Sequence, residues 1–407
     1  MHTIESQKHH YASFLDLARK LGQSEERLLA GERVHTQVQV RSLEEFRDLF
    51  AGGLSDDQRA SNSKDLAVRH QGALSADNPL TRLIDHVSGG APLTADDAQA
   101  VRKMFPLTVT AVSQADMTVT TNITYGPSAS PVLLNVGTLT FNGGSLTTQN
   151  TVLTLNATTL AFGSTPGTLP YHIGVLGVNG TAGTAGAAGA GPNPAQAQSG
   201  SNASPRSPGV CTGVGDGGNG SNGATGKAGG NGSTGNNGLA SLPANITIGA
   251  FSTTSPGNLV LFTQSGAGGQ GGIGGQGGTA QQGGNGGNGC DSGCEGTSGG
   301  NAGSGGVGGA GGNGGQGGNG VNGFNITVTV PKANLGNVFT STAVAAVGQG
   351  GLAGAGGAGG QAGSAGKGGK GSSNGSGGQV GNPGASGTNG SAGTQQGSAG
   401  QFFINGK

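Results

Sequence analysis

Apolar residues recur with a helical spacing before Pro106. In the first segment Phe14, Leu15, Ala18 and Leu21 lie on one face of a predicted helix that ends at Gly22. The segment VHTQVQV alternates instead, which predicts a short strand. Ser42 with Glu45, and Asn78 with Pro79 and Gly89, carry helix-capping signals. The pattern predicts further helices over SLEEFRDLF, NPLTRLIDHVSGG and TADDAQAVRKMF, the first of them stopping at Gly52–Gly53.

From Leu107 the spacing changes to two, which is typical of β-strands. MTVTTNITY alternates from Met117 to Tyr125, and two segments match each other: NVGTLTF at 135–141 and NATTLAF at 156–162. Their offset fits one coil of a β-solenoid or one hairpin repeat of a sandwich, and two copies leave both alternatives open. Similar β units recur at 243–263 and 324–347, and each runs into a glycine-rich block.

Beyond residue 174 glycine recurs at every third position, as in GAGGQGGIGGQGGTAQQGGNGGNG at 266–289. This period matches the polyproline-II helix, which has three residues per turn and no internal hydrogen bonds. Such helices with bare glycine faces can pack side by side and exchange backbone hydrogen bonds. The tracts contain little proline and break often, so we expect short polyglycine-II helices rather than collagen.

The predicted fold class is therefore mainly β/polyproline-II. It combines a small helical (α/β) N-terminal head, solenoid- or sandwich-like β-rich elements and a polyglycine-II helix bundle. The predicted domains are a mixed-charge, mainly helical docking head (1–106), a β-rich neck (107–173) and a glycine-rich body (174–407).

Composition excludes several classes of function. The chain has 92 glycines among 407 residues and a formal net charge of zero, with no basic run for nucleic acid. No segment reaches the apolar length of a membrane span, and the N-terminus has no apolar core of signal-peptide length. We therefore expect no nucleic-acid partner and no membrane span. If the protein acts outside a cell, it must leave by a route other than a Sec signal peptide.

The cysteines lie only in the glycine-rich body. Cys290 and Cys294 are spaced C-x-x-x-C, but no fourth cysteine or nearby histidine completes a tetrahedral metal site. A loop-stapling disulfide between Cys290 and Cys294 is favoured over free thiols, and a metal site comes last. Cys211 is either unpaired or the true partner of one of the other two.

Catalytic signatures are missing from the sequence. His9 and His10 read as a solvated pair, no G-x-S-x-G nucleophile elbow is present, and GGKGSS at 368–373 does not stand between a strand and a helix. We expect no enzyme activity, no cofactor and no metal.

Glycine blocks such as GAGGQGGIGGQGG and GGVGGAGGNGGQGGNG resemble the receptor-binding adhesins at the tail-fibre tips of T-even-like bacteriophages. The resemblance covers roughly 174–400. It implies an attachment domain, a glycine-helix sandwich and host-contacting loops at its far end. Snow-flea antifreeze proteins share the glycine-helix bundle, and mycobacterial glycine-rich surface proteins share the composition. The breaks in the tracts suit chain reversals, so the expected contact loops contain Thr279, Ala280, Gln281, Gln282, Asp291, Ser292 and Glu295.

The expected function is that of a non-enzymatic, surface-exposed adhesive or fibre-associated protein, outside the cell or on a virion or cell surface. Its expected partners are a carrier protein or a second copy, and a cell-surface receptor. The alternative is a self-assembling coat, matrix or filament subunit. A third is an ice-binding protein, suggested by the Thr and Ala register of TAGTAGAAG.

Overall fold

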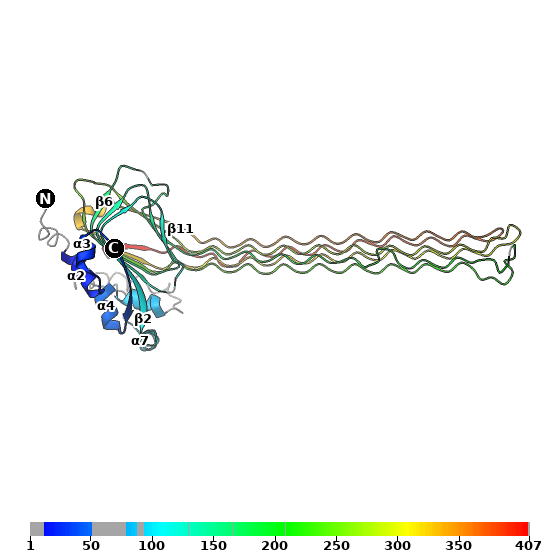
Figure 1. The fold of residues 1–407 in the computed structure, drawn as a ribbon, viewed down its shortest axis with the longest axis horizontal. Helices are drawn as coiled ribbons and strands as arrows, with labels where there is room; N and C mark the ends of the chain where they lie inside the picture. The colour runs from blue at the N-terminus through cyan, green and yellow to red at the C-terminus, as the bar shows by residue number, and fades with distance from the viewer. Residues whose placement is uncertain are drawn as a thin grey trace.

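The computed structural model describes residues 12–50, 79–87 and 93–405, except 129, 166 and 208. It consists of a head built from two β-sheets and short helices, from which a long thin rod projects (Figure 1). The predicted His9–His10 pair and the capping residues Asn78, Gly89 and Gly52–Gly53 lie outside the described residues.

Four helices in the described part of the head occur where the apolar spacing places them, whereas the short helix at 25–29 was not predicted. Thr94 caps α7 (Ala95–Arg102) in a capping box with Asp97, while the Ser42 hydroxyl accepts from the backbone N–H of Glu45 at the start of α4 (Leu43–Phe50). Gly22 closes the first helix with a φ of +70°, a left-handed conformation that glycine adopts without strain. The remaining helices are α2 (Ala12–Lys20), α3 (Glu25–Leu29), α6 (Pro79–Val87) and the 3-10 helix η1 (Lys332–Asn337).

Two sheets organise the head. The first has seven strands in the order β1-β2-β4-β6-β8-β10-β12, and the second has five in the order β11-β9-β7-β5-β3. Within the two sheets every pair of neighbouring strands is parallel except β1 with β2. The strands are β1 (Val34–Val40), β2 (Leu107–Val119), β3 (Ile123–Tyr125), β4 (Val132–Phe141), β5 (Leu146–Gln149), β6 (Leu153–Phe162), β7 (Ile173–Leu176), β8 (Ala244–Phe251), β9 (Leu259–Gln264), β10 (Ile326–Thr329), β11 (Val338–Ala343) and β12 (Phe402–Ile404).

The predicted fold class is wrong. The fold is a mixed seven-stranded sheet with a parallel five-stranded sheet and a few helices, an α/β-like arrangement, and not a solenoid or a polyglycine-II bundle. The matching segments 135–141 and 156–162 pair in parallel, Asn135 with Asn156 and Phe141 with Phe162, which also excludes a hairpin repeat. An antiparallel β1 extends the first sheet, and the glycine tracts are the connections between strands rather than a fold of their own.

Apolar side chains fill the space between the two sheets. Leu139 and Leu160 of the first sheet and Leu259 and Leu261 of the second are completely buried in one cluster. A second cluster lies between the helices and the first sheet, where Phe46, Leu83 and Val109 are buried. The two faces of the central strands are therefore both covered, as is usual for parallel sheets.

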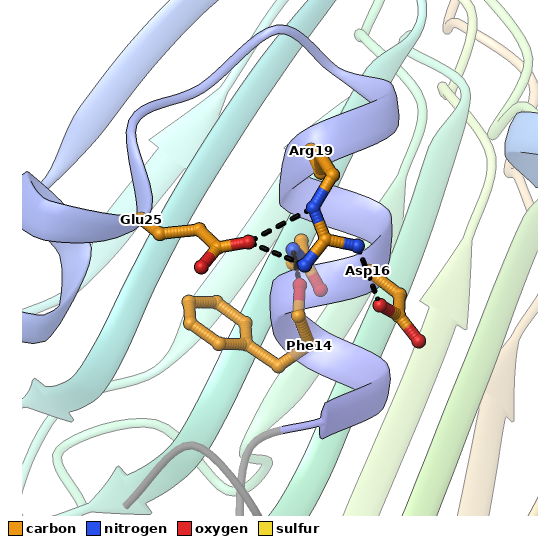
Figure 2. A network of polar contacts seen from close by, with 5 residues as sticks. Phe14, Asp16, Arg19 and Glu25 are labelled. Carbon is orange, nitrogen blue, oxygen red and sulfur yellow. Dashed lines mark hydrogen bonds and ion pairs between the residues drawn. The ribbon is translucent and has the colours of Figure 1, made fainter. Parts of the chain in front are cut away.

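Polar contacts fix α2 on the first sheet. Asn135, which is buried in β4, donates from Nδ2 to the carbonyl oxygen of Phe14 at 2.9 Å (Figure 2). On the outer side of the helix, Arg19 donates to Asp16 at 2.8 Å and also to Glu25, which joins α2 to α3 (Figure 2). Exposed pairs of this kind contribute about 0–1 kcal/mol, so the buried Asn135 bond and Phe14 hold the helix in place.

The rod consists of glycine-rich tracts that run out from the head and back. We name them tract A (177–203), tract B (217–239), tract C (266–289), tract D (297–323), tract E (345–369) and tract F (375–397). Tracts A, C and E continue the order of β7, β9 and β11 in the second sheet, since the N–H of Gly180 donates to Ala267 and that of Gly268 to Ala346. Tracts B, D and F likewise lead into β8, β10 and β12, and they form the other layer.

Backbone N–H groups donate to carbonyl oxygens of neighbouring tracts with a three-residue repeat, about one in three along tracts A, E and F and about two in three along tracts B, C and D. Gly269, Gly272 and Gly275 of tract C, for example, donate to tract B at 2.8 Å each. Tract C also exchanges bonds with tracts A, D and E, which places it in the interior of the rod. A Cβ added at Gly272 would lie 2.0 Å from the carbonyl oxygen of Thr184, so only glycine allows this approach.

Asparagine side chains satisfy backbone groups on the outer face of tracts B, D and F. The N–H of Asn313 donates to Oδ1 of Asn231 at 2.8 Å, and Oδ1 of Asn313 accepts from the N–H of Thr388 at 2.9 Å. The same arrangement links Asn219 to Asn301 at 2.8 Å. These amides replace water at exposed N–H groups, a role that the sequence pattern alone did not indicate.

Replacing Gly311 with Val tests the packing of the rod. A Cβ at this position would lie 2.1 Å from the carbonyl oxygen of Gly354, so tract E must move and its bonds with tract D must break. We expect the free energy of opening the rod locally to fall by about 1–3 kcal/mol, and this loss is measured as faster amide hydrogen exchange along tracts D and E. Ala310→Val is the matched control, because Ala310 is exposed. Equal exchange in the two variants would contradict close packing.

His172 gives the head a dependence on pH. Burial lowers the pKa of its imidazole, and its Nδ1 accepts from the N–H of Val260 at 3.1 Å. The folded state favours the neutral ring, so His172 does not lower the free energy of unfolding above the unfolded-state pKa of about 6.5. As the pH falls below that pKa, protonation favours the unfolded chain and stability is lost. His172→Asn keeps an acceptor but does not titrate. We expect the melting temperature of the wild type, relative to this variant, to fall between about pH 7 and 5. Parallel pH profiles would exclude this role.

Candidate functional site: the distal loops of the glycine rod

The chain reverses at the far end of the rod in three loops, 204–216, 290–296 and 370–374 (Figure 1). Each contains glycine in the left-handed region, with φ of +81° at Gly209, +79° at Gly293 and +76° at Gly371. Residues with a Cβ rarely adopt this conformation, so glycine here serves turning rather than close packing. We call these loops together the distal loops.

A disulfide joins the first two of the distal loops. It links Cys211 to Cys290, with a Cα–Cα distance of 5.8 Å, while Cys294 is an exposed free thiol. The favoured pairing of Cys290 with Cys294 is therefore not the one in the structure, and the alternative partner Cys211 is correct. The two cysteines are 79 residues apart, so no local pattern indicates that they pair. Cys211 lies beside Cys290 only because the chain runs out along tract A and back along tract B.

Glu295 ties the same two loops together by hydrogen bonds. Its Oε1 accepts from the N–H groups of Cys211 and Thr212 and from the Thr212 hydroxyl, each at 2.9 Å. The Thr212 hydroxyl bond is the main cause that lowers the pKa of Glu295, and the N–H of Cys211 adds to it. Glu295, expected as a contact residue, therefore stays ionised and anchors Thr212, a residue that sequence reasoning missed.

Asp291 and Ser292 shape the second loop. Oδ1 of Asp291 accepts from the N–H of Gly293 at 3.0 Å and from that of Lys370 at 3.4 Å. The Ser292 hydroxyl accepts from the N–H of Glu295 at 3.2 Å and donates to its carbonyl oxygen at 2.9 Å. These side chains hold the turn and link it to the third loop, so the distal loops form one connected surface.

The segment TAQQ at 279–282 is not a chain reversal. Tract C runs straight through it, and Ala280 is buried against the neighbouring tracts. Gln281 accepts from the N–H of Ala224 at 2.9 Å and donates to the carbonyl oxygen of Pro194 at 2.8 Å. The Gln281 side chain thus supplies hydrogen bonds beside the irregular stretch of tract A around Pro194. Of these residues only Thr279 is exposed, while Gln281 and Gln282 are half-buried, so the segment lies along the rod and apart from the distal loops.

The distal loops present a mixed, mostly exposed polar surface. Across the residues that the structure describes, no group of three or more His, Cys, Asp or Glu side chains is placed to hold a metal ion. Within the same described ranges, no helix has the length and apolar character of a membrane span. The arrangement offers hydrogen-bonding groups of both charge signs for recognition: Arg206, Asp216, Asp291, Glu295 and Lys370.

Cys211→Ser tests the pairing and its effect. The disulfide closes a long loop of the unfolded chain, so its loss should cost about 2–4 kcal/mol and speed amide exchange in 204–216 and 290–296. Cys294→Ser, the matched control, should leave both unchanged. In the wild type, alkylation without a reducing agent should label Cys294 alone, and a peptide joining Cys290 to Cys294 would contradict the structure.

Comparison with known proteins supplies no relative for this chain. No protein-family model matches it, and neither curated protein sequences nor solved structures give a match. The rod and its distal loops are therefore the features of the chain that bear on its function.

Proposed function

We propose that the protein is a non-enzymatic, surface-exposed adhesive protein whose glycine rod presents the distal loops to a receptor. The proposed place of action is outside the cell or on a virion or cell surface, with the head attached to a carrier. The observation that carries this proposal is the bracing of the distal loops. The Cys211–Cys290 disulfide and the bonds of Glu295 hold them at the far end of the rod from the head.

Bracing matters because ordering a loop on binding costs free energy. A side chain immobilised at an interface costs about 0.5–1.5 kcal/mol, and a preorganised surface avoids part of this cost. A rod that served only as a spacer between assembled subunits would not need a cross-linked end. The exposed polar groups of the distal loops also suit a wet, hydrogen-bonded interface.

The side chains along the lateral edges of the rod disfavour the edge-to-edge association of rods into a continuous sheet. In the interior tract C, only every third residue, such as Ile273 and Gln276, is exposed between buried glycines. In the outermost tracts A and F, two of every three residues are exposed, including Val380 and Pro383. The second side chain stands where a further tract would have to approach, and Pro383 has no N–H to donate. Natural β-sheet edges are protected in a similar way.

The self-assembling building block remains the second candidate because one observation favours it. Ile273 and Leu352 are 50% and 61% exposed on adjacent tracts, and the N–H of Gly274 donates to the carbonyl oxygen of Leu352 at 2.8 Å between them. The formal net charge of zero would do little to keep such faces apart.

Cell-binding and scattering experiments separate the two candidates. We expect the full chain to remain monomeric over a concentration series and to bind bacterial cells. Replacing 291–295 with a glycine-serine loop of equal length should reduce that binding at least tenfold, because Glu295 and Asp291 hold the loops together. A control swap of the exposed residues 253 and 254 in the head should leave binding unchanged.

Regular filaments or sheets in electron microscopy, lost in the variant Ile273→Ser/Leu352→Ser, would instead establish the building block. Monomers whose cell binding survives the 291–295 swap would overturn the proposed role of the distal loops.

A further inference from the structure

A cavity of about 280 Å³ opens in the head, at the opposite end of the rod from the distal loops (Figure 1). Three connections from the first sheet to the second meet there: the β4–β5, β6–β7 and β8–β9 loops. Because β4, β6 and β8 are neighbours in register, their following loops stack at one end of the sheets. The cavity is lined by Phe141, Gly143, Gly144, Phe162, Gly163, Ser164, Thr165, Gly167, His172, Pro256, Gly257 and Asn258.

Aromatic rings form the inner wall of this cavity. The ring of His172 lies 5.0 Å from that of Phe141 and 5.1 Å from that of Phe162, centroid to centroid. Phe141 is buried in the core between the sheets, whereas Phe162 is only partly buried. The cavity therefore offers a rigid apolar surface that the hydrophobic core supports from behind.

Glycine keeps the third loop close to this wall. A Cβ at Gly257 would lie 2.5 Å from the ring atom Cδ2 of Phe162, so a larger residue would displace either the loop or the ring. Asn258 follows directly and lies on the rim of the cavity.

Polar groups with fixed orientation complete the lining. Oδ1 of Asn258 accepts from Nδ2 of Asn337 at 3.1 Å, which sets the plane of the Asn258 amide and leaves its Nδ2 as a donor. Nδ1 of His172 accepts from the N–H of Val260, so the neutral ring carries its proton on Nε2, a second donor. Ser164 and Thr165 add exposed hydroxyl groups, which both donate and accept.

None of the lining residues is an acid, a lysine or an arginine. A phosphate or carboxylate would find no counter-charge there, so the chemistry favours a neutral ligand. A pyranose ring has an apolar C–H face that packs against aromatic rings and hydroxyl groups that bond with amides, imidazole and hydroxyls. Few well-placed polar groups beside an apolar wall are typical of small-molecule sites.

We propose that this cavity binds a neutral sugar, one pyranose unit of a saccharide, between the Phe162–His172 wall and the Asn258 rim. The site is independent of the proposed function of the distal loops. It would add a second, saccharide-directed contact at the head.

The test is saturation-transfer NMR on the full chain with glucose, galactose, mannose and N-acetylglucosamine, each titrated into the millimolar range. We expect saturable transfer for at least one sugar, with a Kd on the order of 1 mM for a single ring. Ser164→Trp, which places a large side chain at the mouth of the cavity, should weaken it at least tenfold. Thr253→Trp is the control, an exposed position in the β8–β9 loop outside the lining.

Melting temperature verifies that Ser164→Trp is folded, and Thr165→Trp at the neighbouring rim position replaces it if not. Saturable binding that Ser164→Trp and Thr165→Trp both leave unchanged would overturn the proposal. Absence of saturable transfer from all four sugars would overturn it as well. Adenosine serves as a planar aromatic probe, and its binding in place of the sugars would assign the cavity to a different class of ligand. Cell binding through the 291–295 loop has no bearing on these outcomes.

Discussion

The close approach of glycine backbones is the constraint on which the rod depends. Along tract C, an added Cβ at Gly269, Gly272 or Gly275 would lie 2.0 Å from a carbonyl oxygen of tract A, well below any real Cβ contact. This spacing lets each interior tract exchange N–H···O=C bonds with neighbours on several sides. Glycine costs more conformational entropy on folding than other residues, and each net hydrogen bond returns only about 0.5–1.5 kcal/mol. An isolated tract would therefore not hold this conformation.

The sheets of the head supply the order that the tracts cannot provide alone. Strand β7 pairs with β9 and then tract A pairs with tract C, so that the bond from Gly177 to Gln264 is followed by that from Gly180 to Ala267. The parallel register of the strands thus fixes the register of the rod. At the other end, the Cys211–Cys290 disulfide prevents the tracts from sliding past one another. The rod is anchored by buried apolar side chains at one end and by covalent and polar links at the other.

The two candidate sites lie in the loops that this frame leaves free. The distal loops follow the ends of tracts A, C and E, and their geometry comes from Glu295, Asp291 and left-handed glycines. The cavity in the head lies where the β4–β5, β6–β7 and β8–β9 loops stack. In both places the loops are positioned by regular backbone pairing below them, which is how rigid scaffolds commonly support recognition.

Local patterns in the sequence determined the elements themselves. The helical spacing before Pro106, the alternation in β1 and the repeat at 135–141 and 156–162 all correspond to helices and strands, because each depends on neighbours within a few residues. The three-residue glycine period likewise fixed which residues can lie at a close backbone contact. Only the tertiary structure decided the fold class and the partners, since strands as distant as β6 and β8 join one sheet across an excursion of the chain through tracts A and B. The pairing of Cys211 with Cys290 and the burial of Ala280 followed from that long-range return, and no pattern of nearby residues contains it.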